Sequence, residues 1–234
     1  MSRERATDNN IREKVNPDGV ISRGYLKEPF RFFDLDNVES DAIQPHYHEF
    51  HKVIIFISGD VEYMAEGTLF RLRPGNILII PAYSVHQPLI SPDTAYKRYV
   101  LWLSCEAAET LGASDIFTKC RITGNKNKVE TAAPDPMIKE IIDYINANLK
   151  NDLSIENLSK KFYISKSSLI KRFKLVTGYT PHRYITNKRL GKSADMISSG
   201  MNIADVAEEN GYEDYSSFFR AFKKIYGVGP GKLN

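Results

Sequence analysis

The last third of the chain contains one hydrophobic pattern twice, about 48 residues apart. The first copy consists of Leu153, Ile155, Leu158, Phe162 and Ile164, and the second of Met201, Ile203, Val206, Asn210 and Tyr212. The offset then becomes 49, which aligns Leu169 with Phe218, Phe173 with Phe222, Gly178 with Gly227 and Pro181 with Pro230. One residue inserted in a turn explains this change. Two copies are too few for a solenoid, so the repeat predicts a pair of similar helical modules with the same docking surface.

The charge of the chain is unevenly distributed. Residues 134–234 hold 16 Lys and Arg against 11 Asp and Glu, whereas residues 1–133 hold 16 against 18. Ten basic residues and no acidic one fall within residues 160–192. A solvated protein surface usually mixes both signs, so this one-sided stretch predicts a polyanionic partner for the helical part.

The order of the patterns predicts an α+β multidomain chain. Residues 1–20 are polar and resemble a flexible arm, and residues 21–120 contain short β-branched and aromatic runs typical of an antiparallel barrel or sandwich. Glu66-Gly67 is one hairpin signal between two of these runs. Residues 121–136 carry few large apolar groups and are expected to be a linker, and residues 137–234 follow helical periodicity.

The composition excludes several classes of protein. No apolar run approaches the roughly 18 residues of a membrane span, and the polar N-terminus is unlike a signal peptide. The only two cysteines, Cys105 and Cys120, have no metal-binding spacing. We therefore expect a cytoplasmic protein with no membrane partner.

Each helical module has the elements of a helix-turn-helix. In the first, Ser154 and Ser165 can cap two short helices separated by a sharp turn. In the second, Asn202 caps the first helix, and Glu213 or Asp214 opens the second. A connecting helix over residues 184–198 would hold the two second helices about one DNA turn apart, roughly 34 Å, on one face of a duplex.

The modules resemble the AraC-type transcription regulators. The resemblance covers residues 137–231 and rests on Pro181, Tyr184, Arg189, Leu190, Ala194, Ile203, Val206, Ala207, Gly211, Tyr212, Phe219, Arg220, Phe222, Lys223, Gly227 and Pro230. It implies that the second helix of each module enters the major groove of double-stranded DNA, and it makes RNA polymerase a candidate partner. Helical faces and resemblance together give twelve candidate DNA-binding residues: Ser165, Lys166, Ser167, Ser168, Ile170, Lys171, Lys174, Tyr215, Ser216, Phe219, Arg220 and Lys223.

A cluster of histidines marks the β-rich part. His46 and His48 lie on one face of an extended segment, and His86 follows a later strand, so three imidazoles can converge. Five residues could form a binding site for a small polar ligand at a barrel mouth: His46, His48, Tyr63, Arg71 and His86. The plainer alternative is that these are rim or turn residues without a ligand.

The arrangement resembles the cupin barrel, in which two motifs supply His, His, a carboxylate and a final His to a metal. Here Lys52 stands where the carboxylate would be, and an ammonium beside a divalent cation is repulsive. The sequence therefore favours a small-molecule effector over a metal, and we expect no cofactor. In the resembling regulators the cupin domain commonly senses a sugar or a related metabolite.

Three functions remain open at this point. The first is a ligand-responsive transcription regulator that binds a specific DNA sequence and is not an enzyme. The second is a metal-dependent cupin enzyme with an accessory helical domain, and the third is a nonspecific nucleoid protein, which the acidic residues 1–133 disfavour. The short segment 106–136 leaves little room for the dimerisation helix that the resemblance implies, so the sequence does not decide between a homodimer and a monomer.

Overall fold

The structure is a computed structural model that describes residues 13–15, 21–23, 26, 28–38, 43–124 and 130–233. Most of the expected arm of residues 1–20 lies outside these ranges. The chain forms two compact units, Met1–Pro134 and Asp135–Asn234, each with its own core. Among the described helices, none is long and apolar enough to cross a membrane.

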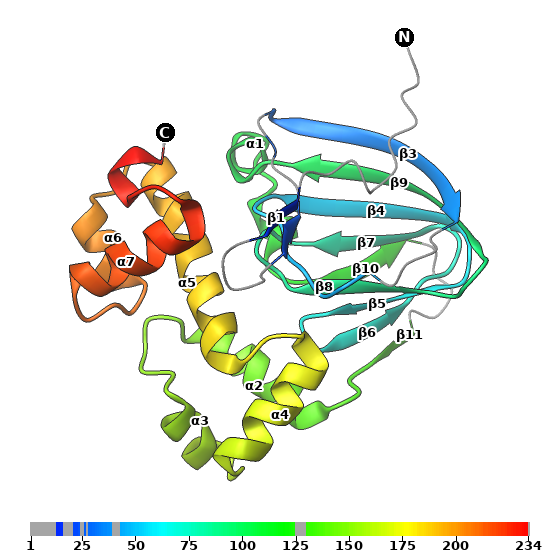
Figure 1. Cartoon of the computed structure of the whole chain (residues 1–234). Coiled ribbons are helices and arrows are strands. Elements are labelled where there is room, and N and C mark those ends of the chain that lie inside the picture. The colour runs from blue at the N-terminus through cyan, green and yellow to red at the C-terminus, as the bar shows by residue number, and fades with distance from the viewer. Residues whose placement is uncertain are drawn as a thin grey trace. The chain divides into compact units, whose positions relative to one another are not determined.

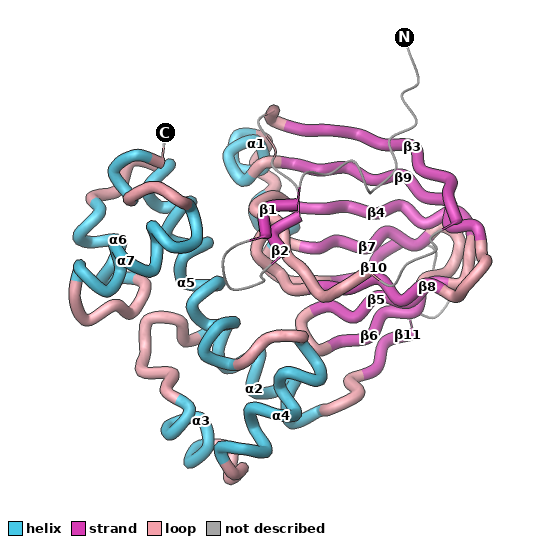
Figure 2. The backbone as a smooth tube through the Cα atoms, in the orientation of Figure 1, coloured by secondary structure: helices cyan, strands magenta, loops and turns pink. Residues whose placement is uncertain are grey.

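The first unit contains two antiparallel sheets that face each other (Figures 1 and 2). The five-stranded sheet has the order β10-β7-β4-β9-β3. Its strands are β3 (Phe30–Val38), β4 (His51–Ser58), β7 (Asn76–Ile80), β9 (Ala95–Leu103) and β10 (Arg121–Gly124). The four-stranded sheet has the order β11-β6-β5-β8 and consists of β5 (Val61–Ala65), β6 (Thr68–Arg71), β8 (His86–Ile90) and β11 (Glu130–Ala132). A separate ribbon pairs β1 (Glu13–Val15) with β2 (Ile21–Arg23).

The core of this unit lies between the two sheets because successive side chains of a strand point to opposite faces. In β4 the buried residues Lys52, Ile54 and Phe56 alternate with half-buried ones. The predicted hairpin between β5 and β6 is confirmed: Glu66 and Gly67 both have positive φ, 49° and 74°, as a two-residue turn of type I′ requires. The cupin-like antiparallel fold that the sequence predicts is therefore present.

The segment expected to be a linker belongs largely to the first unit. Within residues 121–136, β10 pairs with β7, and β11 pairs with β6, so each extends one of the two sheets. The boundary between the units falls after Pro134. The sequence pointed to a linker because both strands are short and mostly exposed edge strands, which lack the apolar pattern of inner strands.

A small helical pair packs against β4, β7 and β9, the three inner strands of the five-stranded sheet. It consists of α1 (Cys105–Thr110) and the 3₁₀ helix η2 (Ser114–Phe117). Ala108 and Phe117 pack with Ile79 and Leu103 in a second apolar cluster. The ring of His51 stacks on Phe117 with the centroids 4.1 Å apart, and its Nδ1 accepts a hydrogen bond from the amide of Ala82 at 3.0 Å.

The second unit is helical. Its elements are α2 (Pro136–Ala147), α3 (Ile155–Lys161), α4 (Lys166–Thr177), α5 (Pro181–Ser198), α6 (Ile203–Glu209), α7 (Tyr215–Tyr226) and the 3₁₀ helix η3 (Pro230–Lys232). The predicted caps are confirmed, since Ser154, Ser165, Asn202 and Asp214 each accept a hydrogen bond from a backbone amide at the start of their helix. Two helix-turn-helix modules, α3–α4 and α6–α7, are therefore joined by α5.

Arg189 of α5 contacts residues next to both modules. Its guanidinium donates to the carbonyl oxygens of Leu149 at 2.9 Å and Asn151 at 2.7 Å, just before α3. The same guanidinium lies over the ring of Tyr212, which follows α6. At Gly211 a Cβ atom would approach both the Lys150 and the Leu149 carbonyl oxygen closer than 3.0 Å, so only glycine permits this close packing.

Candidate functional site

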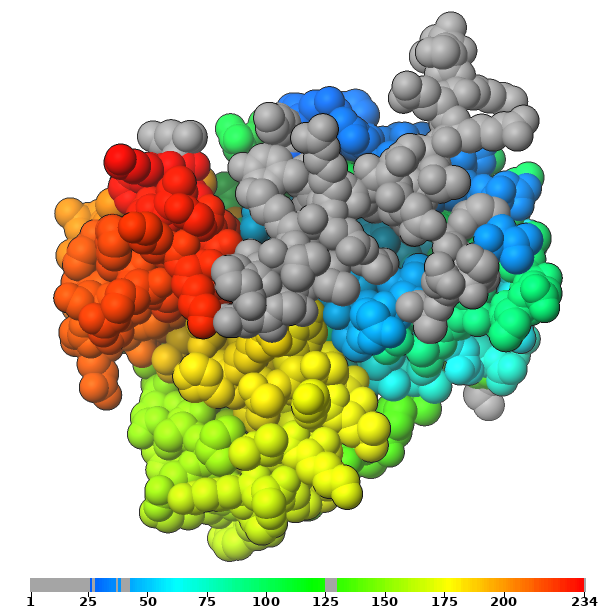
Figure 3. Space-filling view, in the orientation of Figure 1, coloured from blue at the N-terminus to red at the C-terminus, as the bar shows by residue number. Residues whose placement is uncertain are grey.

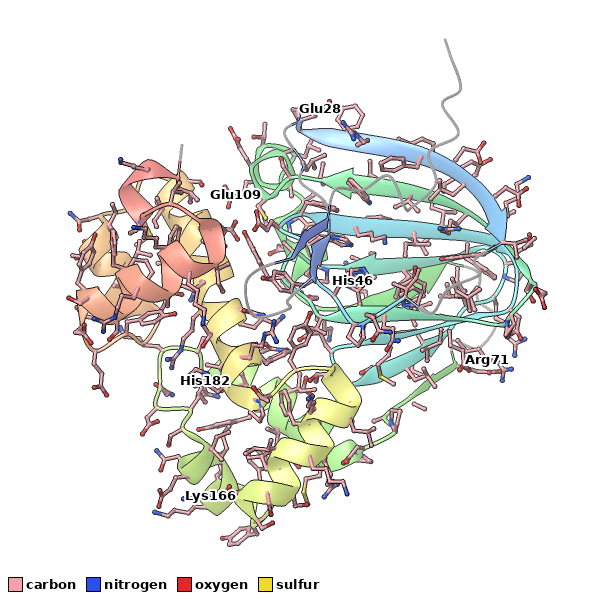
Figure 4. The ribbon with its side chains drawn as sticks, viewed as in Figure 1. Glu28, His46, Arg71, Glu109, Lys166 and His182 are labelled. Carbon is pink, nitrogen blue, oxygen red and sulfur yellow. The ribbon has the colours of Figure 1, made fainter. Side chains whose placement is uncertain are left out.

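One candidate surface is the outer face of α4. Leu169 and Phe173 are fully buried and hold the helix in the module, as their i, i+4 spacing predicts. Six of the seven predicted contact residues on this element are exposed, Ser165, Lys166, Ser167, Ile170, Lys171 and Lys174, and Ser168 is half-buried. The yellow surface that includes α4 is open to solvent in Figure 3, and Figure 4 shows Lys166 at its edge.

The second candidate surface is the equivalent face of α7. Phe218 and Phe222 are fully buried, while Tyr215, Ser216, Phe219, Arg220 and Lys223 are exposed. The guanidinium of Arg220 donates to the Ser217 hydroxyl at 3.2 Å, which orients it along the helix. Phe219 is 37% exposed, and its ring lies where a Cβ on Gly229 would come within 2.7 Å. Phe219 therefore packs partly against the C-terminal turn and offers only part of its ring to a partner.

Glu156 of α3 neutralises part of the basic surface. One carboxylate oxygen lies 3.1 Å from Lys166 Nζ and the other lies 3.2 Å from Lys160 Nζ. Hydrogen bonds from Lys166 and Lys160 hold the pKa of Glu156 below its ordinary value. These are exposed ion pairs, which water and salt weaken, so a phosphate can replace the carboxylate as the partner of either lysine.

In the first unit the three predicted imidazoles do converge. His46 and His86 form an isolated antiparallel bridge, with His46 N donating to His86 O at 3.0 Å and His86 N to His46 O at 2.8 Å. His48 completes the cluster, and the three ring centroids are 4.5–5.0 Å apart. All three side chains are at most 3% exposed, and their possible ligand atoms lie within 4.8 Å of one another. They are therefore interior groups and not rim residues.

The other two predicted ligand-site residues differ: Tyr63 is buried and Arg71 is exposed. Tyr63 is buried, and its hydroxyl receives a hydrogen bond from the Tyr96 hydroxyl at 3.3 Å. Arg71 instead is exposed at the end of the inner strand β6, where it pairs with Glu62 and Glu130 on the two neighbouring strands (Figure 4). The structure does not bring Arg71 to the histidine cluster.

Two buried cations were not among the predicted ligand-site residues: Arg98, which sequence reasoning missed, and Lys52, which it considered only as an obstacle to a metal. Lys52 is 5% exposed on the inner face of β4, and Arg98 is 2% exposed on the inner face of β9. The guanidinium of Arg98 lies 3.8 Å from the centroid of the Tyr96 ring and donates to the Tyr96 carbonyl oxygen at 3.0 Å. The alternation of Tyr96, Arg98 and Val100 along an apolar strand was the signal that could have placed Arg98 inside.

Comparison with known proteins assigns both units. An AraC-like ligand binding domain matches residues 36–160, and a helix-turn-helix domain matches residues 158–234. The probable transcriptional regulator LumQ of Photobacterium leiognathi is 33% identical over 221 residues, which cover 79% of this chain and 89% of LumQ. The chain belongs to the AraC family.

Two further matches to this AraC-family protein each cover less than half of the chain. The multiple antibiotic resistance protein MarA of Escherichia coli K12 is 33% identical over 96 residues, covering 41% of this chain and 76% of MarA. A solved C-terminal domain of AraT, a response regulator from Geobacillus stearothermophilus, is 27% identical with a TM-score of 0.42, covering 44% of this chain and 86% of that domain. The two domain matches and the likeness to LumQ make this AraC-family chain a DNA-binding transcription regulator with a ligand-binding domain.

Proposed function

We propose that this protein reads two adjacent major-groove segments of a specific operator through α4 and α7, and that a small molecule held inside the first unit changes this binding. The observation that carries the proposal is the repeated module. In both copies the second helix buries two apolar residues and exposes hydroxyl and basic side chains on the opposite face, joined by Ile170 in α4 and by Tyr215 and Phe219 in α7. Such side chains contact base edges and phosphates without filling the groove.

Arg189 supports simultaneous contact by both helices. Its hydrogen bonds to the carbonyls before α3 and its contact with Tyr212 after α6 make the modules one packed body. A rigid pair of reading helices contacts successive grooves without a further entropic cost for ordering them. A separation of about one helical turn of DNA between α4 and α7 is part of this proposal.

The interior of the first unit supports effector binding. Three imidazoles, two tyrosine hydroxyls and the cations Lys52 and Arg98 are buried in a unit whose core is mostly apolar. A few polar groups converging in an apolar interior are typical of sites for small molecules. We propose His46, His48, Tyr63 and His86 as contacts for a sugar or a related polar metabolite, and Arg71 is not part of this proposal. The family assignment favours regulation over enzymatic catalysis, and function in the cytoplasm.

Footprinting on fragments from the regulator's own promoter tests the DNA part of the proposal. Protection of two major-groove segments about 10 base pairs apart on one face is expected. Arg220→Ala should cost about 1–3 kcal/mol at one base position and relax the sequence preference there. Lys97→Ala removes the same charge from the first unit and serves as the control, with no change in preference.

A footprint with a single protected segment would contradict the proposal that both modules contact DNA at the same time. An unchanged preference in Arg220→Ala would remove this residue from base contact. Thermal-shift screening against sugars and other metabolites tests the effector, because a ligand that binds only the folded unit raises the melting temperature. Contact with RNA polymerase and assembly into a homodimer stay predictions from the family resemblance.

A further inference from the structure

We propose that His46, His48 and His86 bind one divalent transition-metal ion through three imidazole nitrogens. The sequence argued against a metal because no carboxylate follows His48 at the expected distance. The structure shows a complete three-nitrogen set that does not need that position. The proposal concerns the same three histidines that are proposed above as effector contacts, and it is tested separately because metal binding is measured on the protein without DNA or effector.

The geometry fits a metal ion with little movement. Nitrogens bound to one tetrahedral ion at about 2.0–2.1 Å stand about 3.3 Å from each other. The possible ligand atoms of the three side chains already lie within 4.8 Å of one another. The backbone bridge between His46 and His86 fixes two of the three side chains on neighbouring positions of paired strands. Modest rotation of the rings is therefore enough to close the site.

The hydrogen bonds of two rings select the tautomer that binds metals. His46 Nδ1 lies 2.8 Å from the Gln44 carbonyl oxygen, and His86 Nδ1 lies 2.9 Å from the Ser84 carbonyl oxygen. A carbonyl oxygen only accepts, so each Nδ1 carries the proton and each Nε2 carries the lone pair. Metal-binding histidines are usually oriented in this way, with the second ring nitrogen donating to a carbonyl or carboxylate.

The donor set selects the class of metal. Three neutral imidazoles suit Zn²⁺, Co²⁺, Ni²⁺, Cu²⁺ or Fe²⁺, whereas Mg²⁺ and Ca²⁺ require oxygen ligands. Within the described ranges, no Asp, Glu or Cys joins the group. Three protein ligands leave a fourth position open, as in zinc sites that bind water or an exogenous molecule.

Lys52 constrains what fills the open position. Its side chain is buried on the same inner face of the first unit as the histidine cluster. A divalent cation bound by neutral ligands and an ammonium group repel each other in a poorly hydrated interior. An anionic fourth ligand, such as hydroxide or a carboxylate, offsets this repulsion.

Metal analysis of the full chain tests the proposal. The protein, purified without a histidine tag, is stripped with EDTA, loaded with Zn²⁺ or Co²⁺, and dialysed before elemental analysis. One equivalent per chain and the visible absorption of four-coordinate Co²⁺ are expected. X-ray absorption of the zinc form should show three imidazoles in the first shell, a readout that needs no variant.

Single variants assign the site. His46→Gln and His86→Gln should each weaken Zn²⁺ binding by more than the roughly 10–100-fold lost when an outer-shell partner is removed. His182→Gln, on the exposed surface of α5, is the matched control and should bind like the wild type. Circular dichroism without metal shows whether each variant folds.

Two results would overturn the proposal. One is a wild-type protein that retains less than about a tenth of an equivalent of Zn²⁺, Co²⁺ or Ni²⁺ and shows no thermal shift with any of them. The other is stoichiometric metal with no imidazole in the first shell, or metal that folded His46→Gln and His86→Gln bind as tightly as the wild type. The footprint of the metal-free protein reports separately on DNA binding.

Discussion

Asp135 and Arg172 form a bidentate ion pair that ties the start of α2 to α4. Arg172 Nε lies 2.8 Å from Asp135 Oδ2, and Nη2 lies 2.6 Å from Oδ1. Asp135 Oδ1 also caps α2 by accepting a hydrogen bond from the Ile138 amide at 3.2 Å. The hydrogen bond from Arg172 is the main reason why the pKa of Asp135 is lowered. One carboxylate thus holds the proposed reading helix against the helix that precedes the modules.

Two substitutions separate these roles. Asp135→Asn keeps a good N-cap and loses the charge, and it should lower the free energy of unfolding by about 1 kcal/mol. Asp135→Ala loses both contacts and should cost about 2 kcal/mol. Urea unfolding followed by circular dichroism measures both. An unchanged free energy of unfolding in Asp135→Asn would show that the ion pair contributes nothing, and equal losses in the two variants would show that the cap contributes nothing.

His51 should make the first unit sensitive to acid. Burial lowers its pKa from 6.5 to about 4. The unfolded chain therefore binds the proton more readily than the folded chain, so this contribution is complete above pH 6.5 and is lost as the pH falls towards 4. The loss is at most about 3 kcal/mol. His51→Phe keeps a ring against Phe117, and its unfolding free energy should fall less steeply between about pH 7 and 4.5. An unchanged slope would assign the acid sensitivity to other groups.

Glu156 should restrain DNA binding at low salt, because DNA phosphates compete with its carboxylate for Lys160 and Lys166. Glu156→Gln is expected to raise the affinity for nonspecific duplex DNA and to steepen its salt dependence by up to about two phosphate contacts. Glu140→Gln removes the same charge from the exposed side of α2 and should change the affinity less. Fluorescence anisotropy at several salt concentrations gives both values, and equal effects of the two variants would reject a local role.

The two turns of the modules should respond differently to substitution. Tyr163 occupies the position of the first copy that Gly211 occupies in the second, and their φ angles are 50° and 73°. Tyr163 is 95% exposed, so Tyr163→Gly should change the unfolding free energy by less than about 1 kcal/mol. Gly211→Ala forces a Cβ against two carbonyl oxygens and should cost more than about 2 kcal/mol. Similar losses in the two variants would contradict this difference in packing.

Much of the helical unit could be predicted because its signals are local. Hydroxyl and carboxylate caps, the i, i+4 pairs Leu169/Phe173 and Phe218/Phe222, and the repeat itself all lie within short windows of sequence. The convergence of His46, His48 and His86 could also be predicted, since alternation along strands fixes which side chains share a face.

The missed features depend on contacts between distant residues. Two short edge strands, β10 and β11, carry little apolar pattern and form because their partners β7 and β6 offer hydrogen bonds. The outward position of Arg71 depends on its ion pairs with Glu62 and Glu130. Glu130 lies 59 residues after Arg71 in the sequence. Period-2 alternation gives two possible faces for such a strand, and only the register of the sheet selects one.

The contacts that Arg189 makes with both modules have a consequence for promoters. Inserting about five base pairs between the two contacted grooves rotates the second groove by half a turn, away from α7. Two modules joined by a flexible linker could still reach the displaced second groove. The two modules of this protein, packed together at Arg189 and Gly211, could not. Promoters controlled by this regulator should therefore tolerate base substitutions between the two contacted segments far better than changes in the length of that spacer.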